Sequence, residues 1–143
     1  MSAFTPDKNH TDAPVDWDAL KARDRFGSWL GIRSLETKPG YSKLQMTVSE
    51  EMLNPMGITH GGIVFSFADT ALGYACNAGG KRAVALEASI SFIKASYAGD
   101  ILTAETQQVH DGKTTGLYII TVINQRNEKI ALFKGTCFNK GGE

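Results

Sequence analysis

The chain has 143 residues, of which 42% are hydrophobic, and this is enough apolar material for the core of one domain. Lysine plus arginine equals aspartate plus glutamate at 15 each, and no basic cluster follows a helix or strand pattern, which excludes the charge distribution of a nucleic-acid-binding protein. The first residues contain no apolar run preceded by basic residues. This argues against secretion and membrane insertion and predicts a cytoplasmic protein.

Residues 1–15 combine prolines and polar residues without periodicity, so we expect a mobile arm there and a single domain over 16–143. From Asp16 a helical spacing continues until Gly27 and Gly31, which predicts one short amphipathic helix. A strand is expected at 32–36. After turn residues at 38–40, the next segment alternates apolar and polar residues over 41–49, as in a half-buried strand.

The stretch from Gly61 to Gly79 is apolar on almost every side, which predicts a helix of about five turns that the rest of the protein covers. It is interrupted by polar residues and is shorter than a bilayer span, so a core helix is expected rather than a membrane segment. Asp69 lies in the middle of this helix. A carboxylate in apolar surroundings is costly unless it is paired, hydrogen-bonded or used in chemistry.

Four strand-like runs follow at 82–94, 100–110, 115–125 and 129–139, with turn residues between them. Their lengths predict long antiparallel strands joined by hairpins. In the third run both alternating sets of residues are apolar, which predicts cover on both faces. The order is β-β-α-β-β-β-β, and an α+β arrangement with one long helix wrapped by a curved antiparallel sheet satisfies it.

Neither the cysteines nor the histidines predict a metal site. Cys76 lies in the helix pattern and Cys137 in the last strand, and at no metal or redox spacing the two are expected to be reduced, buried thiols. His10 and His110 are far from His60 in the sequence and follow no ligand pattern.

The beginning of the long helix is the first candidate site. Gly61 and Gly62 lie where free N–H groups of the first turn would attract a developing negative charge, such as a carbonyl oxygen under attack. A tight turn into the helix is the structural alternative. Asp69 is eight residues further on, about 12 Å along the helix axis. If Gly61 and Asp69 share a reacting group, the two must come from different protomers; otherwise Asp69 is held for structural reasons.

Two residues before the helix have similarly open roles. Asn54 precedes Pro55 and is either a turn residue or an amide that hydrogen-bonds a water molecule or a substrate carbonyl. His60 either polarises the same carbonyl or orients the loop that leads into the helix.

At these residues the sequence resembles the hotdog-fold acyl-CoA thioesterases of the phenylacetate-degradation (PaaI) type. The resemblance is carried by Asn54, His60-Gly61-Gly62, Phe65 and Ala68-Asp69, within LNPMGITHGGIVFSFADTALGYACNAGG. It continues in SISFIKASYAGDILTAE and GLYIITVINQRNEKIALFKGTCF. It implies the hotdog fold and a homodimer with a continuous sheet as the minimal active unit, often doubled to a homotetramer. It also implies that the Gly61 N–H polarises a thioester carbonyl, that the partner subunit's Asp69 acts as base or nucleophile, and that Asn54 assists.

The resemblance also suggests substrate contacts. They are Gly62 at the helix start, Phe65 in the acyl pocket, Thr70 in place of a threonine that relatives have at position 73, and Lys94 near the phosphates of coenzyme A. Leu72 and Tyr74 are further candidates to line an acyl pocket between two central helices.

The function that follows is hydrolysis of an acyl-CoA, with an aromatic acyl group such as phenylacetyl or hydroxyphenylacetyl, to free acid and coenzyme A. Thioester hydrolysis needs no metal and no cofactor. A hydroxyacyl hydratase or dehydratase of the same fold is one alternative, although its proline-rich loop is missing from ITHGGIV. A non-catalytic acyl-CoA sensor is the other.

Overall fold

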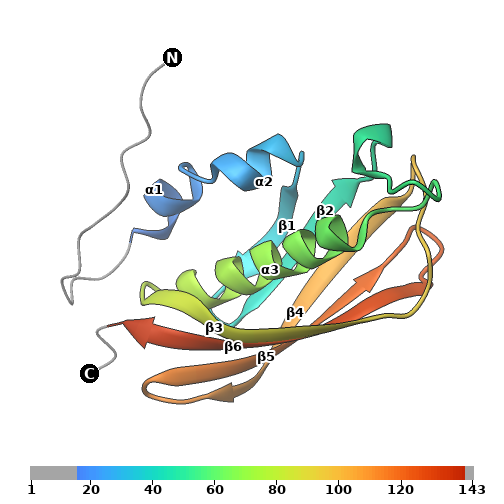
Figure 1. Ribbon diagram of the computed structural model, residues 1–143. Helices are drawn as coiled ribbons and strands as arrows, with labels where there is room; N and C mark the ends of the chain where they lie inside the picture. The colour runs from blue at the N-terminus through green and yellow to red at the C-terminus, as the bar shows by residue number, and fades with distance from the viewer. Residues whose placement is uncertain (1–15, 141–143) are drawn as a thin grey trace.

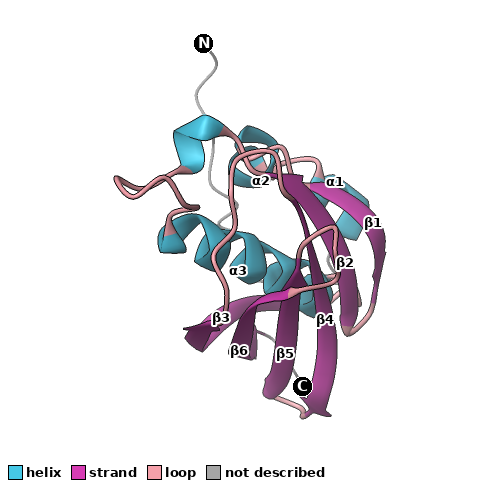
Figure 2. Cartoon of the chain, turned by 90° about the vertical axis from the view of Figure 1, so that its right-hand side faces the viewer, coloured by secondary structure: helices cyan, strands magenta, loops and turns pink. Residues whose placement is uncertain are grey.

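The computed structural model describes residues 16–140, so the arm predicted over 1–15 lies outside the described residues. One long helix, α3 (Gly61–Asn77), lies against one face of a six-stranded antiparallel sheet that curves around it (Figures 1 and 2). The strands are β1 (Arg33–Lys38), β2 (Tyr41–Thr47), β3 (Arg82–Phe92), β4 (Ile101–Asp111), β5 (Thr115–Ile123) and β6 (Lys129–Lys140). This is the helix-and-sheet arrangement predicted from the sequence. None of the helices within 16–140 is both long and apolar enough to cross a bilayer.

The strand order is β1-β2-β4-β5-β6-β3, which corrects one part of the prediction. Hairpins join β4 to β5 and β5 to β6, but β3 pairs with β6 at the edge of the sheet and is not a neighbour of β4. The chain after β3 crosses to the centre of the sheet, where the Val48 N–H donates to the Asp100 carbonyl at 2.9 Å just before β4. Inserting β4 between β2 and β5 places its apolar residues Leu102 and Ala104 in the core.

The core lies between α3 and the inner face of the sheet. The helix contributes Val64, Phe67, Ala68, Ala71, Leu72 and Ala75, and the central strands contribute Leu44, Met46, Leu102, Ala104, Ile120 and Val122. On β5 the inward residues are buried and the alternate residues are half-buried. The expectation that β5 is covered on both faces is therefore met on one face only, because nothing in residues 16–140 packs over the outer face of the sheet.

The helix predicted after Asp16 is divided into two. α1 (Trp17–Lys21) is capped by Asp16, whose side chain accepts from the Ala19 N–H at 3.2 Å. α2 (Arg25–Trp29) is capped by Asp24, whose side chain accepts from the Gly27 N–H at 2.8 Å. The second capping residue starts a new helix where the helical spacing alone suggested that one helix continues. Both helices lie beside α3, near β1 (Figure 1).

Cys76 and Cys137 form a disulfide, so the prediction of two reduced thiols is wrong. Cys76 is in the last turn of α3, and Cys137 is an inward residue of β6. The two cysteines are 61 residues apart in sequence. Only the packing of the helix against the sheet brings them together, so the spacing carried no signal.

Candidate active site

α3 begins with a histidine cap that uses one amide and leaves another open. His60 Nδ1 accepts a hydrogen bond of 2.8 Å from the Gly62 N–H. The Gly61 N–H has no acceptor among residues 16–140. Of the two glycine amides predicted to face a substrate, only that of Gly61 is therefore available. Because Nδ1 is an acceptor, the neutral ring of His60 carries its proton on Nε2.

The ring of Phe92 lies against this helix start, a position that the sequence analysis did not predict. A β-carbon added at Gly61 would lie 3.0 Å from Cζ of Phe92, so a glycine is what allows the ring to come this close. Phe92 is the last residue of β3, and 58% of its surface is exposed. Only the position of β3 in the sheet brings it to the helix.

Asn54 takes the first of the two roles that the sequence left open, that of a turn residue. Its Oδ1 accepts hydrogen bonds from the N–H groups of Met56 at 3.0 Å and Ile58 at 3.3 Å, which makes it a turn residue. Its Nδ2 has no acceptor among residues 16–140 and is a free donor. The His60 N–H donates to the Met52 carbonyl at 2.8 Å, which fixes the turn next to the start of α3.

Asp69 lies in the third turn of α3. It is half-buried and has no hydrogen-bond or ion-pair partner within 16–140. Burial raises the pKa of its carboxyl above the usual value of 3.8. Gly61 and Asp69 occupy one straight helix about 12 Å apart along its axis, so a single chain does not bring them together.

The sequence model of the thioesterase superfamily matches residues 56–131, a segment that contains the helix start and Asp69. The chain is a member of the thioesterase superfamily. It is 43% identical to the acyl-coenzyme A thioesterase PaaI of Escherichia coli K12 over 124 residues, which are 87% of this chain and 89% of PaaI. The resemblance inferred from the sequence is thus confirmed.

Solved structures of relatives agree with the fold. The structure of Escherichia coli PaaI matches with a TM-score of 0.83 at 42% identity, over 85% of this chain and 88% of that one. The structure of smu.793 from Streptococcus mutans UA159, bound to acetyl CoA, matches with a TM-score of 0.73 at 31% identity, over 76% of this chain and 87% of that one. The hotdog fold predicted from the sequence is therefore confirmed.

In this thioesterase-superfamily chain, each predicted substrate contact other than Gly62 has a partner within residues 16–140. Phe65 packs edge-on against Phe133, with ring centroids 5.1 Å apart. The Thr70 hydroxyl donates to the Ser66 carbonyl at 2.8 Å within α3. Lys94 forms an ion pair with Glu128, so a phosphate group would have to compete with that carboxylate for Lys94.

Glu128 is the centre of a small charged cluster after β5. Lys94, Asn124 and Arg126 donate hydrogen bonds to its carboxylate and lower its pKa to about 2. The negative charge of Glu128 is thus shared between two cations, and Lys94 is held by it at the end of β3.

Leu72 and Tyr74, predicted to line an acyl pocket between two central helices, line neither of the two hollows described below. Leu72 is 1% exposed in the core. Trp17 packs edge-on against the Tyr74 ring at 5.0 Å, and the Tyr74 hydroxyl donates to Asp24 at 2.5 Å. Within its own chain Tyr74 is therefore covered by α1 and hydrogen-bonded to the capping residue of α2.

A hollow that the sequence did not indicate lies at the other end of α2. Its volume is about 210 Å³, and its lining residues are Trp29, Leu30, Ser49, Glu51, Met52 and Ile63. They come from α2, the 3-10 helix η1 (Glu50–Met52) with its cap Ser49, and the first turn of α3. No local pattern joins these three segments, so only the fold shows the hollow.

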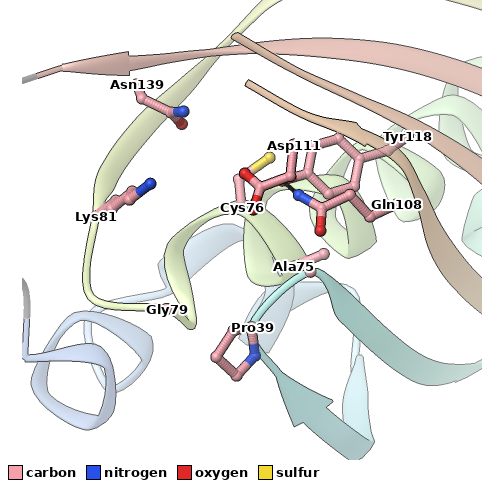
Figure 3. A pocket seen from close by; sticks show the side chains of 10 residues that line it. Pro39, Ala75, Cys76, Gly79, Lys81, Gln108, Asp111, Tyr118 and Asn139 are labelled. Atoms are coloured by element: carbon pink, nitrogen blue, oxygen red, sulfur yellow. Dashed lines mark hydrogen bonds between the residues drawn. The ribbon is translucent and has the colours of Figure 1, made fainter. Parts of the chain in front are cut away.

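A second hollow, of about 220 Å³, lies at the C-terminal end of α3 (Figure 3). Cys76, Lys81, Asp111 and the hydrogen-bonded pair Gln108 and Tyr118 are among its lining residues, and the Gln108 Nε2 donates to the Tyr118 hydroxyl at 2.9 Å. This hollow contains none of the residues predicted for the site. It is more than 20 Å from Gly61 by about 1.5 Å of rise per residue, and we do not assign it to the chemistry.

Proposed function

We propose that the protein hydrolyses acyl-CoA thioesters to a free acid and coenzyme A. The observation that carries this proposal is that one helix has both an open Gly61 N–H at its start and a half-buried Asp69 with no partner within 16–140 in its third turn. A relative with 43% identity, PaaI, is named an acyl-coenzyme A thioesterase, and smu.793 was solved bound to acetyl CoA. Both relatives support the reaction class.

The helix start stabilises the negative charge that develops on the carbonyl. The Gly61 N–H donates to the thioester oxygen, and the attraction between that oxygen and the positive end of the α3 dipole grows as the oxygen gains charge in the tetrahedral intermediate. The free Nδ2 of Asn54 supplies a second donor to the carbonyl or to the attacking water. The His60 cap keeps the Gly62 N–H occupied, so the oxygen is directed to Gly61.

The partner subunit's Asp69 completes the site. As a general base its carboxylate takes a proton from water while the water oxygen bonds to the carbonyl carbon. The tetrahedral intermediate then collapses, the carbon–sulfur bond breaks, and coenzyme A leaves as a thiolate that takes up a proton. As a nucleophile, the carboxylate would bond to the carbon first and water would hydrolyse the resulting anhydride. Burial raises the pKa of Asp69, which makes its carboxylate a stronger base in the first case and a stronger nucleophile in the second.

The edge of the sheet supports a site made by two chains. β3 is an edge strand with only β6 as its neighbour, and it carries exposed apolar side chains at Val84, Leu86 and Phe92. An exposed apolar edge strand is a ready surface for pairing with another strand. We therefore propose a homodimer that continues the sheet across β3 as the minimal active unit, doubled to a homotetramer.

The aromatic acyl group belongs to the same proposal. Its support is the similarity to PaaI, whose structure is described as coming from the phenylacetic acid degradation operon. We expect phenylacetyl or hydroxyphenylacetyl thioesters to be better substrates than straight-chain ones.

Thiol release from a panel of aryl and alkyl CoA esters tests the proposal. Asp69→Asn should lower kcat by about 10²-fold or more without unfolding the protein, because it removes the base or nucleophile. Asp111→Asn is the matched control. Asp111 is the last residue of β4 and lines the hollow at the C-terminal end of α3, so this variant should retain the wild-type rate.

Full activity of Asp69→Asn would contradict a chemical role for Asp69. Absence of thiol release from every ester would contradict the thioesterase assignment, and a dehydration product without thiol would place the protein among the lyases. In a single turnover, ¹⁸O from labelled water that enters the Asp69 carboxylate would identify Asp69 as the nucleophile.

A further inference from the structure

We propose that the hollow lined by Trp29, Leu30, Met52 and Ile63 binds the acyl group of the thioester, and that Trp29 selects flat aromatic acyl groups. This inference rests on the proposed function. It adds to that function a place for the acyl group and a residue that sets its specificity. None of the four residues was a candidate in the sequence.

The position of the hollow relative to the open amide is the first argument. Ile63 is two residues after Gly61, in the same turn of α3. Met52 accepts the His60 N–H at 2.8 Å through its carbonyl, so it is fixed beside the residue that caps the helix. The carbonyl carbon of a thioester bound at the Gly61 N–H carries the acyl substituent directly, and that substituent is placed next to the hollow.

Size and polarity form the second argument. A volume of about 210 Å³ is below the roughly 300–1,000 Å³ of sites that enclose whole drug-sized ligands. The hollow therefore suits an acyl group and leaves coenzyme A outside. Four of its six lining residues are apolar, and Leu30 and Met52 are buried at 4% and 8% exposure. Ser49 and Glu51 add polar side chains to its wall.

Contacts with the rest of the fold hold the wall of the hollow in place. Met52 Sδ accepts from the Ser49 N–H at 3.5 Å, which fixes the Met52 side chain. Trp29 ends α2, and Leu30 next to it is anchored in the core. Asp24, which caps α2, also accepts from the Tyr74 hydroxyl of α3. The wall that holds the acyl group is thus tied to the helix that carries Gly61 and Asp69.

The exposure of Trp29 is the fourth argument. Its side chain is 77% exposed, although it borders an apolar hollow, and the ring of Phe26 lies 6.0 Å away. An indole exposed at the mouth of an apolar site offers a flat face to a ligand. Aromatic pairs add a stacking contribution that an alkyl chain of equal size does not obtain.

The test compares phenylacetyl-CoA with octanoyl-CoA, whose acyl groups have equal numbers of carbon atoms. Trp29→Ala should lower kcat/KM for phenylacetyl-CoA by about tenfold and should change that for octanoyl-CoA much less. Trp29→Phe should keep most of the preference. Leu35→Ala removes a side chain of β1 that is 49% exposed and outside the hollow, and it should leave both values unchanged.

A binding measurement provides a second readout. The chain has two tryptophans, so in an Asp69→Asn background the fluorescence change caused by phenylacetyl-CoA should disappear when Trp29→Phe is added. An unchanged fluorescence response, or an equal fall of kcat/KM for both esters in Trp29→Ala, would overturn the acyl site while leaving the thioesterase function intact. A wild-type protein that hydrolyses neither ester would overturn both.

Discussion

The C-terminal end of α3 is tied to the sheet, whereas its N-terminal end leaves a backbone donor unused. At the C-terminal end the Asn77 side chain accepts from the Ala83 N–H at 2.9 Å and donates to the Ala83 carbonyl at 3.1 Å. Cys76 adds a covalent link to β6. At the N-terminal end the Gly61 N–H has no acceptor within 16–140. A helix held firmly at one end can present an open amide at a fixed position at the other, as electrostatic catalysis requires.

Removing the disulfide between Cys76 and Cys137 should have the largest effect, and it should act on the free energy of unfolding. The double variant Cys76→Ala and Cys137→Ala should lose about 4 kcal/mol of unfolding free energy, the value expected from the closed-loop length of 61 residues. Urea denaturation measures this loss. A reducing agent should shift the wild-type midpoint toward that of the double variant and should not affect the variant. A wild-type midpoint that ignores the reducing agent would contradict the prediction.

Removing the open donor should affect activity to a similar degree, without affecting the fold. Gly61→Pro deletes the N–H at the first helical position, where proline is tolerated, and His60 already has an extended ψ of 134°. We expect kcat to fall about 10²–10³-fold, as for the loss of one oxyanion donor. Gly61→Ala creates the same contact with Phe92 but keeps the N–H, so it is the matched control.

The same variant tests whether two chains form the site. Mixed subunits of Gly61→Pro and Asp69→Asn contain one complete site per heterodimer, so refolding them together should restore about a quarter of wild-type activity. Each variant alone stays inactive. A mixture with no more activity than its components would show that one chain supplies both groups.

The Asn77 hydrogen bonds at the C-terminal end of α3 should contribute less to the free energy of unfolding than the disulfide does. Asn77→Ala leaves the buried Ala83 N–H without its acceptor, and we expect a loss of about 1–3 kcal/mol in unfolding free energy. Asn77→Asp keeps an acceptor for the Ala83 N–H but places a carboxylate oxygen against the Gly73 and Ala83 carbonyls, so it should lose at least as much. Activity per folded molecule should be unchanged at low temperature, since Asn77 is about 24 Å from Gly61 along the helix.

The smallest expected effect is that of the Asp69 charge on the stability of the folded state. Because burial raises the folded pKa of Asp69 above 3.8, its ionisation destabilises the folded state as pH rises. Asp69→Asn should therefore have a higher Tm than wild type at pH 7, and the difference should vanish below pH 3.8.

Glu128→Gln should behave oppositely, because its neighbours lower the Glu128 pKa from 4.5 to about 2. The variant should be less stable at neutral pH, with the difference lost as pH falls toward 2.

Local periodicity explains which parts of the fold were predictable. The all-apolar stretch from Gly61 gave α3 to within two residues of its end at Asn77, and alternation gave the strands closely. The edge position of β3 depends on which strands pair across the sheet, and no local pattern contains that information. The cap at Asp24 was readable in principle, because an aspartate before a helical segment is a common start signal.

The site shows the same division. Sequence spacing established that Gly61 and Asp69 are too far apart to meet in one chain. It did not distinguish the Gly61 amide from that of Gly62, because that difference depends on which amide the His60 ring accepts. Phe92 and Trp29 were missed, since each reaches the start of α3 from a segment distant in sequence.

The contact between Phe92 and Gly61 has a consequence for regulation. Phe92 is the last residue of the exposed edge strand β3, and its ring lies against the start of α3. If a second copy pairs with β3, subunit association and the shape of the oxyanion site depend on the same ring. Turnover per chain would then follow mass action, falling on dilution, and the amount of protein made by the cell would itself set how active each molecule is.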